Sequence, residues 1–429
     1  MKLCNIIPLV FSIFLVLNVN AQLKIDAEVR PRFEYRHGFK TLFPNDTDPA
    51  AFVSQRTRLN AGYKKDKLIF YLSMQDVRVW GDVPQLNTSD KNGFSVHQAW
   101  AQLLFDPNLS LKVGRQELIY DDHRLFGNVG WAQQARSHDA ALIKFQKEKF
   151  KFDLGFAFNQ DGQALSGTIL TTPGTYKSIQ YAWLHKDWEN FSGSFLFLNN
   201  GLQFIDEKEA DNNETRYSQT LGSHLKFNKE KVGLIGNLYY QFGKDKANND
   251  LSAYLLGLEA NYMFSQKVKT GLGVELQSGN DNGAPTDEKN DAFTPFYGTN
   301  HKFNGFMDYF YVGNHLNNVG LLDLYVKAIL KVNPKSNFIT FVHNFSAAAD
   351  LPDEGSKQLG TELDFVYSYS FDKNINIMAG YSHLFASNGM EILKNNFDDN
   401  VNNWAWVMIT IKPTLFKSDS EVKPKKDHH

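Results

Sequence analysis

Residues 23–36 read LKIDAEVRPRFEYR, a segment in which apolar and charged residues alternate. Consecutive side chains of an extended strand point to opposite faces, so this segment predicts a strand with one apolar and one charged face. The apolar face holds Leu23, Ile25, Ala27, Val29, Pro31, Phe33 and Tyr35, and the charged face holds Lys24, Asp26, Glu28, Arg30, Arg32, Glu34 and Arg36. Because proline cannot donate to a sheet ladder, Pro31 would mark a bulge or an unpaired position.

The same alternation recurs along the whole chain. It predicts eighteen strands, which begin near residues 23, 52, 67, 94, 109, 138, 149, 175, 190, 215, 231, 251, 267, 319, 336, 357, 374 and 401. Every second connection is tight and rich in charged or turn-forming residues, such as DPN at 106–108. The intervening connections are mostly long, above all 279–318.

This parity predicts an all-β fold, a transmembrane antiparallel β-barrel of about 18 strands with short periplasmic turns and long extracellular loops. Hydrocarbon offers no hydrogen-bond partner for a free sheet edge, so the sheet must close on itself. A propeller or a soluble sandwich would not explain strands of about 10 to 14 residues whose apolar face opposes a charged one. The mean hydropathy of −0.40 excludes a bundle of apolar membrane helices.

The two ends of the chain differ from the strands between them. Residues 1–21 place Lys2 before an apolar stretch and small residues after it, which predicts a cleaved export signal peptide. Residues 22–416 form the predicted outer-membrane barrel, and 417–429 a polar C-terminal tail. Cys4, the only cysteine, lies within the signal, so the exported chain would hold no disulfide. We therefore expect the bacterial outer membrane as the location.

The distribution of charge is more informative than its total. The formal net charge of −2 gives no support for a nucleic-acid partner. Nine of the ten arginines, however, lie before residue 137. Arg30 and Arg32 share one face of a strand, and so do Arg56 and Arg58 on the next, so their guanidiniums would form a ladder on the lumen wall.

An interior of eighteen strands is too wide for side chains alone to fill, so the polar face would set the selectivity of a channel. The planar fork of arginine suits carboxylate, phosphate or sulfate groups. Neutralisation by nearby carboxylates such as Glu28 and Glu34 is the alternative, and we expect both in part.

Three stretches resemble the alginate export family of outer-membrane porins: QDVRVWGD at 75–82, HQAWAQL at 97–103 and GRQELIYDDHRLFGNVGWAQQARSHDAALIKF at 114–145. The opening RPRFEYR and QRTRLNAGY at 55–63 fit the same pattern. The resemblance implies an eighteen-stranded barrel whose electropositive, arginine-lined constriction passes an acidic polysaccharide. It makes these residues the candidate pore lining: the cations Arg30, Arg32, Arg56, Arg58, Arg78, Arg115, Arg124 and Arg136, with Asp76, Asp121, Asp122 and Asp139 as anchors or counter-charges.

Two expectations concern the segment that carries this resemblance. Arg115 shares parity with the apolar Leu111 and Val113, so a bulge or the strand end would have to turn it inward. The loop beyond it, with Trp131 and Gln133, would fold into the barrel as a partial plug.

We expect a channel that passes an anionic polysaccharide or oligosaccharide, such as an alginate-like uronate, by passive diffusion. The alternatives are a general or sugar-uptake porin of another substrate class, or a non-conducting binding or scaffold protein. An enzyme is disfavoured, because no GxSxG or HExxH occurs and the consecutive residues Ser137, His138 and Asp139 would not converge in a strand.

No cofactor is expected, although the acidic, Asn-rich stretch within 279–318 leaves Ca²⁺ open as an alternative to solvation. The expected partners are the anionic saccharide, outer-membrane lipid and a periplasmic export or uptake protein. We expect a monomer, and the direction of transport stays open.

Overall fold

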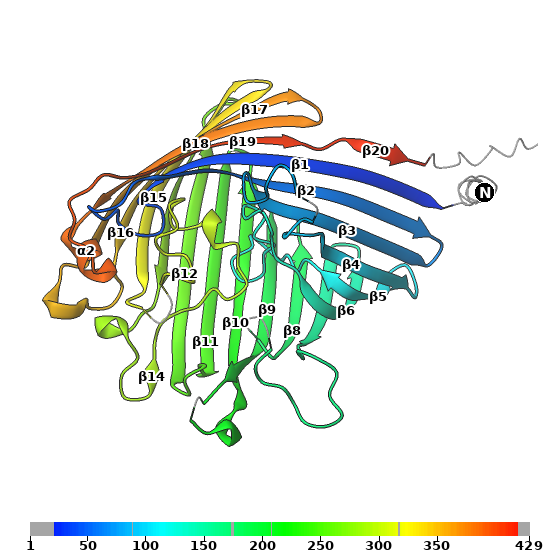
Figure 1. The fold of residues 1–429 in the computed structure, drawn as a ribbon, viewed down its shortest axis with the longest axis horizontal. Coiled ribbons are helices and arrows are strands. Elements are labelled where there is room, and N and C mark those ends of the chain that lie inside the picture. Colours follow the sequence, from blue (N-terminus) through cyan, green and yellow to red (C-terminus); the bar gives the residue numbers. More distant parts are fainter. Residues whose placement is uncertain (1–20, 88, 173–175, 207, 316–317, 419–429) are drawn as a thin grey trace, which may run out of the picture.

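The computed structural model describes residues 21–87, 89–172, 176–206, 208–315 and 318–418, so nearly all of the expected signal peptide and of the polar tail lies outside the described residues. Within the described part, twenty strands form one closed sheet (Figure 1). Eighteen of them make an antiparallel barrel wall. No helix in the described residues is long and apolar enough to cross a membrane.

The wall strands are β1 (Gln22–His37), β2 (Ala50–Lys65), β3 (Leu68–Val79), β4 (Ser95–Leu104), β5 (Leu109–Gln116), β6 (His138–Lys147), β7 (Phe150–Phe158), β8 (Ser178–Asp187), β9 (Phe191–Phe204), β10 (Glu214–Lys229), β11 (Val232–Lys244), β12 (Asp250–Met263), β13 (Val268–Gln277), β15 (Leu321–Asn333), β16 (Ser336–Ser346), β17 (Gln358–Asp372), β18 (Ile375–Ala386) and β19 (Asn402–Ile411). The remaining two are β14 (Lys289–Asn290), which pairs with the start of β12, and β20 (Thr414–Lys417), which continues the last strand beside β1. A short helix, α2 (Asn388–Lys394), lies in the loop between β18 and β19.

The barrel closes where the first strand meets the last. β1 pairs with β2 on one side and with β19 on the other, and every other wall strand pairs with its neighbours along the chain. Pro31 pairs with Gln55 of β2 but has no partner in the β19 ladder, as expected of a residue without an amide hydrogen. The predicted fold class is confirmed, and all eighteen predicted starts lie within three residues of a wall strand.

Connections alternate between tight and long, as predicted. Turns of two to four residues join β2 to β3, β6 to β7, β10 to β11 and the other pairs at the short-turn rim. The opposite rim carries most of the chain outside the wall, with its longest segment at 278–320. In a bacterial outer-membrane barrel the short turns lie on the periplasmic side.

Exposure separates the two faces of the wall. Phe33, Leu238 and Val407 are 44%, 56% and 46% exposed and point outward. Glu34 is fully buried and Arg30 only 7% exposed, because they point into the barrel. Soluble proteins bury apolar groups and expose charged ones, whereas this wall has apolar groups outside and charges inside. A barrel whose outer face contacts lipid requires this arrangement.

Glycines let large rings lie flat on the inner wall. Gly273 is paired with Tyr325 on the neighbouring strand, and a Cβ added to it would lie 2.0 Å from the Tyr325 ring. Gly380 is paired with Trp406, and a Cβ there would lie 2.4 Å from the indole. Covering a strand glycine with a cross-strand aromatic ring fixes register and fills the space left by the missing side chain.

The two faces of β17 offer a direct test of the orientation. Phe365→Arg should destabilise the barrel by about 2–4 kcal/mol, because it places a charge against the lipid core. Ser368→Arg on the same strand points into the lumen and should cost little. Denaturant unfolding in lipid vesicles measures both, and equal destabilisation would contradict the assigned faces.

Candidate functional site

The loop between β5 and β6, residues 117–137, folds into the barrel (Figure 1). Leu118 and Phe126 are 2% and 1% exposed, and Tyr120 donates a hydrogen bond to Asp153 on β7 at 2.8 Å. The backbone of Phe126 also forms an isolated parallel β-bridge with Tyr297 in the second long loop, residues 278–320. The two loops therefore meet inside the barrel, where they narrow its interior.

Arginines of β1 hold the first loop against the wall. Arg30 donates to the carbonyl oxygens of Gly130 and Trp131 at 2.8 and 3.2 Å, and to Oε1 of Gln133 at 2.9 Å. Arg32 donates to the Trp131 carbonyl at 2.6 Å, and its guanidinium lies 4.0 Å from the centre of the Trp131 ring. We call the contacts of Arg30 and Arg32 with residues 130–133 the arginine clamp.

Arginines of β2 extend the same surface. Arg56 pairs with Glu28 at 2.5 Å and donates to the Gln133 carbonyl at 3.4 Å. Arg58 donates to Gln75 at 2.8 Å, while its buried Nη2 has no hydrogen-bond partner among the described residues. Arg58 is thus the member of the ladder that is held by a neutral side chain and has one donor without a protein partner.

Four of the candidate pore-lining residues point outward. On β3, Asp76 and Arg78 lie directly opposite Thr57 and Gln55 of β2, which in turn lie opposite Val29 and Pro31 of β1. Directly opposed residues of neighbouring strands share a face, and Val29 and Pro31 are on the outer face. They form an ion pair at 2.7 Å near the long-loop rim. Asp76 and Arg78 therefore do not line the interior.

Arg115 and Asp139 also lie on the outer face. Their side chains are 45% and 61% exposed and form an ion pair at 2.8 Å. Arg115 keeps the parity of the outward Val113, and no bulge turns it inward. Strand register separates both pairs from the β1 and β2 arginines, and exposure does so as well for Arg115 and Asp139. Sequence alternation alone already pointed the same way for Arg115.

The other candidates belong to the inward loop. Arg124 is 1% exposed, forms an ion pair with Glu275 on β13, and donates to Asn304 at 2.9 Å. Arg136 donates to the Gly298 carbonyl at 3.1 Å, and burial lowers the pKa of its guanidinium. Both cations join the two loops to each other or to the wall.

The two aspartates of this loop bind the opposite wall. Asp121 accepts a hydrogen bond from the Trp183 indole at 3.1 Å, and burial raises the pKa of its carboxyl despite this contact. Asp122 accepts from Asn237 on β11 at 2.7 Å. These contacts fix the start of the loop on β8 and β11, across the interior from the arginine clamp.

Buried acidic residues that sequence reasoning did not select hold the second loop. Asn304 donates to Glu275 and Asp323 at 2.9 and 3.2 Å, and Glu362 accepts from the amide of Met307 at 2.9 Å. Their signal was present in the alternation, since Glu275, Asp323 and Glu362 lie on the face of their strands opposite the outward apolar residues. What was missing was the loop that they bind.

Two further groups of contacts fix the outer end of that loop. The hydroxyl of the fully buried Tyr309 donates to the carbonyl oxygens of Gly38 and Thr41. Lys394 of α2 donates to the Tyr309 carbonyl at 2.7 Å, and burial lowers the pKa of its ammonium to about 8. The aromatic residues at 309–311 thus include a loop-packing anchor.

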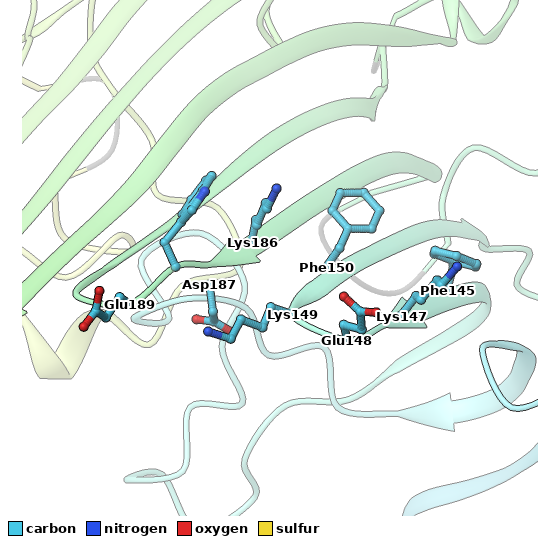
Figure 2. A pocket seen from close by; sticks show the side chains of 9 residues that line it. Phe145, Lys147, Glu148, Lys149, Phe150, Lys186, Asp187 and Glu189 are labelled. Atoms are coloured by element: carbon cyan, nitrogen blue, oxygen red, sulfur yellow. The ribbon is translucent and has the colours of Figure 1, made fainter.

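The space left between the loops and the wall is a cavity of about 680 Å³. Trp131 and Phe303 of the loops line it, together with Tyr325, Phe341 and Trp406 of the wall. A separate hollow of about 510 Å³ lies at the short-turn rim, where Figure 2 shows Lys147, Glu148 and Lys149 near Asp187 and Glu189. Bases and acids are mixed there, so the hollow favours neither ligand charge.

Within the described residues, no group of three or more His, Cys, Asp or Glu side chains is placed to hold a metal ion. The expectation about cofactors therefore stays a prediction, including that about Ca²⁺.

A closed eighteen-stranded wall with a polar interior and inward loops is the architecture of an outer-membrane porin. Solved structures support this class. The chain is similar to OccAB4 of Acinetobacter baumannii at TM-score 0.62 and 13% identity, over 92% of this chain and 98% of that one. It is also similar to OpdK and OpdL of Pseudomonas aeruginosa at TM-scores 0.60 and 0.59, with 12% and 13% identity over 92% of this chain and 98% and 99% of theirs.

The chain belongs to the alginate export family, whose model matches residues 21–401. No curated protein matches it. Family and fold together place the protein in the bacterial outer membrane, as predicted, and indicate a transport channel rather than an enzyme.

Gln133 tests the arginine clamp. Gln133→Ala removes the acceptor of Arg30 and the donor to Ser54, and losing a hydrogen bond to a charged group costs about 1.5–3 kcal/mol. The loop should leave the wall more often, which raises the mean single-channel conductance. Gln134→Ala is the control, because Gln134 is exposed and contributes its carbonyl, which the variant keeps. Equal conductance in the two variants would contradict the clamp.

Proposed function

We propose that this channel passes an anionic polysaccharide or oligosaccharide, such as an alginate-like uronate, by passive diffusion along the basic wall of β1 and β2. The observation that supports it is the charge of that wall. Between Glu28 and Arg58, five arginines and two glutamates project inward, an excess of three positive charges. The inner-facing arginines are Arg30, Arg32, Arg36, Arg56 and Arg58.

The hydrogen-bond partners of these arginines preserve that excess. Arg30 bonds to carbonyl and amide oxygens, which satisfy its donors without cancelling its charge. A uronate carries one carboxylate per ring. A row of fixed cations on the wall lowers the free energy of each of these carboxylates as it passes through the channel. Arg58 is the group to which we assign direct contact, because its side chain is partly exposed and is held by the neutral Gln75 and not by a carboxylate.

The charge of Arg58 is tested by ion selectivity. A unit charge about 4 Å from a permeating ion contributes about 1 kcal/mol even in bulk water, which favours an anion about fivefold and disfavours a cation by the same factor. Arg58→Gln should therefore reduce the anion-to-cation permeability ratio by about 5-fold to 30-fold. Arg58→Glu should reduce it further. Reversal potentials across planar bilayers under a salt gradient measure both.

Arg115→Gln is the matched control, since it removes an arginine from the outer face. Glutamate at Arg30, Arg32, Arg56 and Arg58 together should reverse the preference, although that variant also loses the clamp. Unchanged selectivity in both Arg58 variants would overturn the basic pathway. A protein that inserts without conducting would support a binding or scaffold role, and a pore blocked equally by neutral and uronate oligosaccharides would support a general porin.

A further inference from the structure

The 680 Å³ cavity differs in chemistry from the basic wall beside it. Its floor on the wall is apolar and aromatic, and is formed by Tyr325, Ile329, Ile339, Phe341, Val366 and Met378. Phe303 and Phe306 cover it from the second inward loop, and the Phe306 and Phe341 rings meet edge to face at 5.5 Å. Its volume lies within the about 300–1,000 Å³ range of small-molecule sites.

The carboxylates that border this cavity already have partners. Glu259 pairs with Lys327 at 2.6 Å and accepts from Tyr325 at 2.9 Å. Asp323 pairs with His343 at 2.9 Å, and Glu275 pairs with Arg124. Asp122, the fourth carboxylate of the lining, accepts from Asn237 on β11 at 2.7 Å and lies 3.6 Å from His224 on β10. The three cation-paired carboxylates therefore offer little uncompensated negative charge to a ligand, and that of Asp122 is held towards β10 and β11.

Lys302 is the cation that stays available at this cavity. Its side chain is exposed, and its ammonium donates to the backbone carbonyl of Asp122 at 2.9 Å. No carboxylate among the described residues lies within ion-pair distance of it. Because the backbone carbonyl is a neutral acceptor, the ammonium of Lys302 keeps its full charge. The cavity therefore has one position for an anionic group beside its apolar floor.

We propose that this cavity binds a small aromatic carboxylate, with its ring between Phe341 and Phe303 and its carboxylate at Lys302. A pyranose acid is the less suitable occupant, because the hydroxyls on the side of its ring that faces the floor would meet Ile329, Ile339, Val366 and Met378, which offer no hydrogen-bond partners. An aromatic ring has no such groups to desolvate, and offset or edge-to-face contacts with the surrounding rings add to its burial.

This site goes beyond the saccharide pathway in both residues and ligand. The pathway depends on the ladder arginines, whereas the cavity depends on Lys302 and the rings of β15 and β16. The channel would then have two substrate classes with separate contacts.

Current blockade in planar bilayers tests the site with four probes. Benzoate has both ring and charge, benzyl alcohol the ring alone, acetate the charge alone, and glucuronate the charge on a hydroxylated ring. Benzoate should block at the lowest concentration. Lys302→Gln should weaken its block about fivefold, the change expected for one charge at about 4 Å, and leave benzyl alcohol unaffected. Lys335→Gln, in the turn between β15 and β16, is the matched control.

Phe341→Ala should weaken benzoate and benzyl alcohol together. Block by glucuronate as strong as by benzoate, with the same dependence on Lys302, would overturn the aromatic ligand in favour of a sugar acid. Benzoate block that is equal in Lys302→Gln and Lys335→Gln would overturn the site. Salt-gradient selectivity of the Arg58→Gln channel, read in the same bilayers, reports on the basic pathway separately, and its benzoate block should match that of the unchanged channel, so that the two proposals fail independently.

Discussion

The structure depends on one constraint, which is that no backbone group in the wall can be left unpaired in hydrocarbon. The pairing of β1 with β19 meets it, and the other features follow from that closure. A closed wall of eighteen strands must be apolar outside, which explains Phe33 and Val407 at its surface. It must also enclose a volume that side chains alone do not fill.

Filling that volume with chain requires polar groups on the inner face. A loop brings unpaired amides and carbonyls with it, and each needs a partner once it is buried. The wall supplies donors at the arginine clamp, where Arg30 and Arg32 bind loop carbonyls, and acceptors on β17, where Glu362 binds the amide of Met307. Charged residues on the inner wall therefore serve packing and, on the proposed function, permeation as well.

The positions and faces of the strands could be predicted from the sequence, because both follow from the alternation of apolar and polar residues. This alternation depends only on residues that are close together in the chain. Glu34 and Arg30 point inward and Phe33 outward as alternation requires. The site was predicted only in part, because it depends on which loop meets which strand. Gln133 and Arg30 are far apart in sequence, and nothing local indicates that they touch.

The misplaced candidates have a different physical origin. Arg78 and Arg115 were grouped with the ladder because they belong to the stretches that carry the family resemblance. Register assigns them to the outer face, where each forms an ion pair with an aspartate on the same face, Asp76 and Asp139. The Arg115–Asp139 pair is exposed on both sides, and an ion pair of this kind contributes little to stability. Alternation was the better guide at Arg115, since parity is a geometric property and motif membership is not.

Hydrogen bonding and charge neutralisation are separate requirements for a buried arginine. Along β1, one arginine has both met by its partners and another has only the first. Glu34 meets both for Arg32, because it accepts a hydrogen bond and cancels a charge. At Arg30 the partners are neutral oxygens, so the donors are satisfied while the charge persists. On the proposed function this division matters. A guanidinium paired with a carboxylate would hold the loop equally well but would give a passing uronate no field. Neutral partners let the same arginine anchor the loop and contribute to the potential of the pathway.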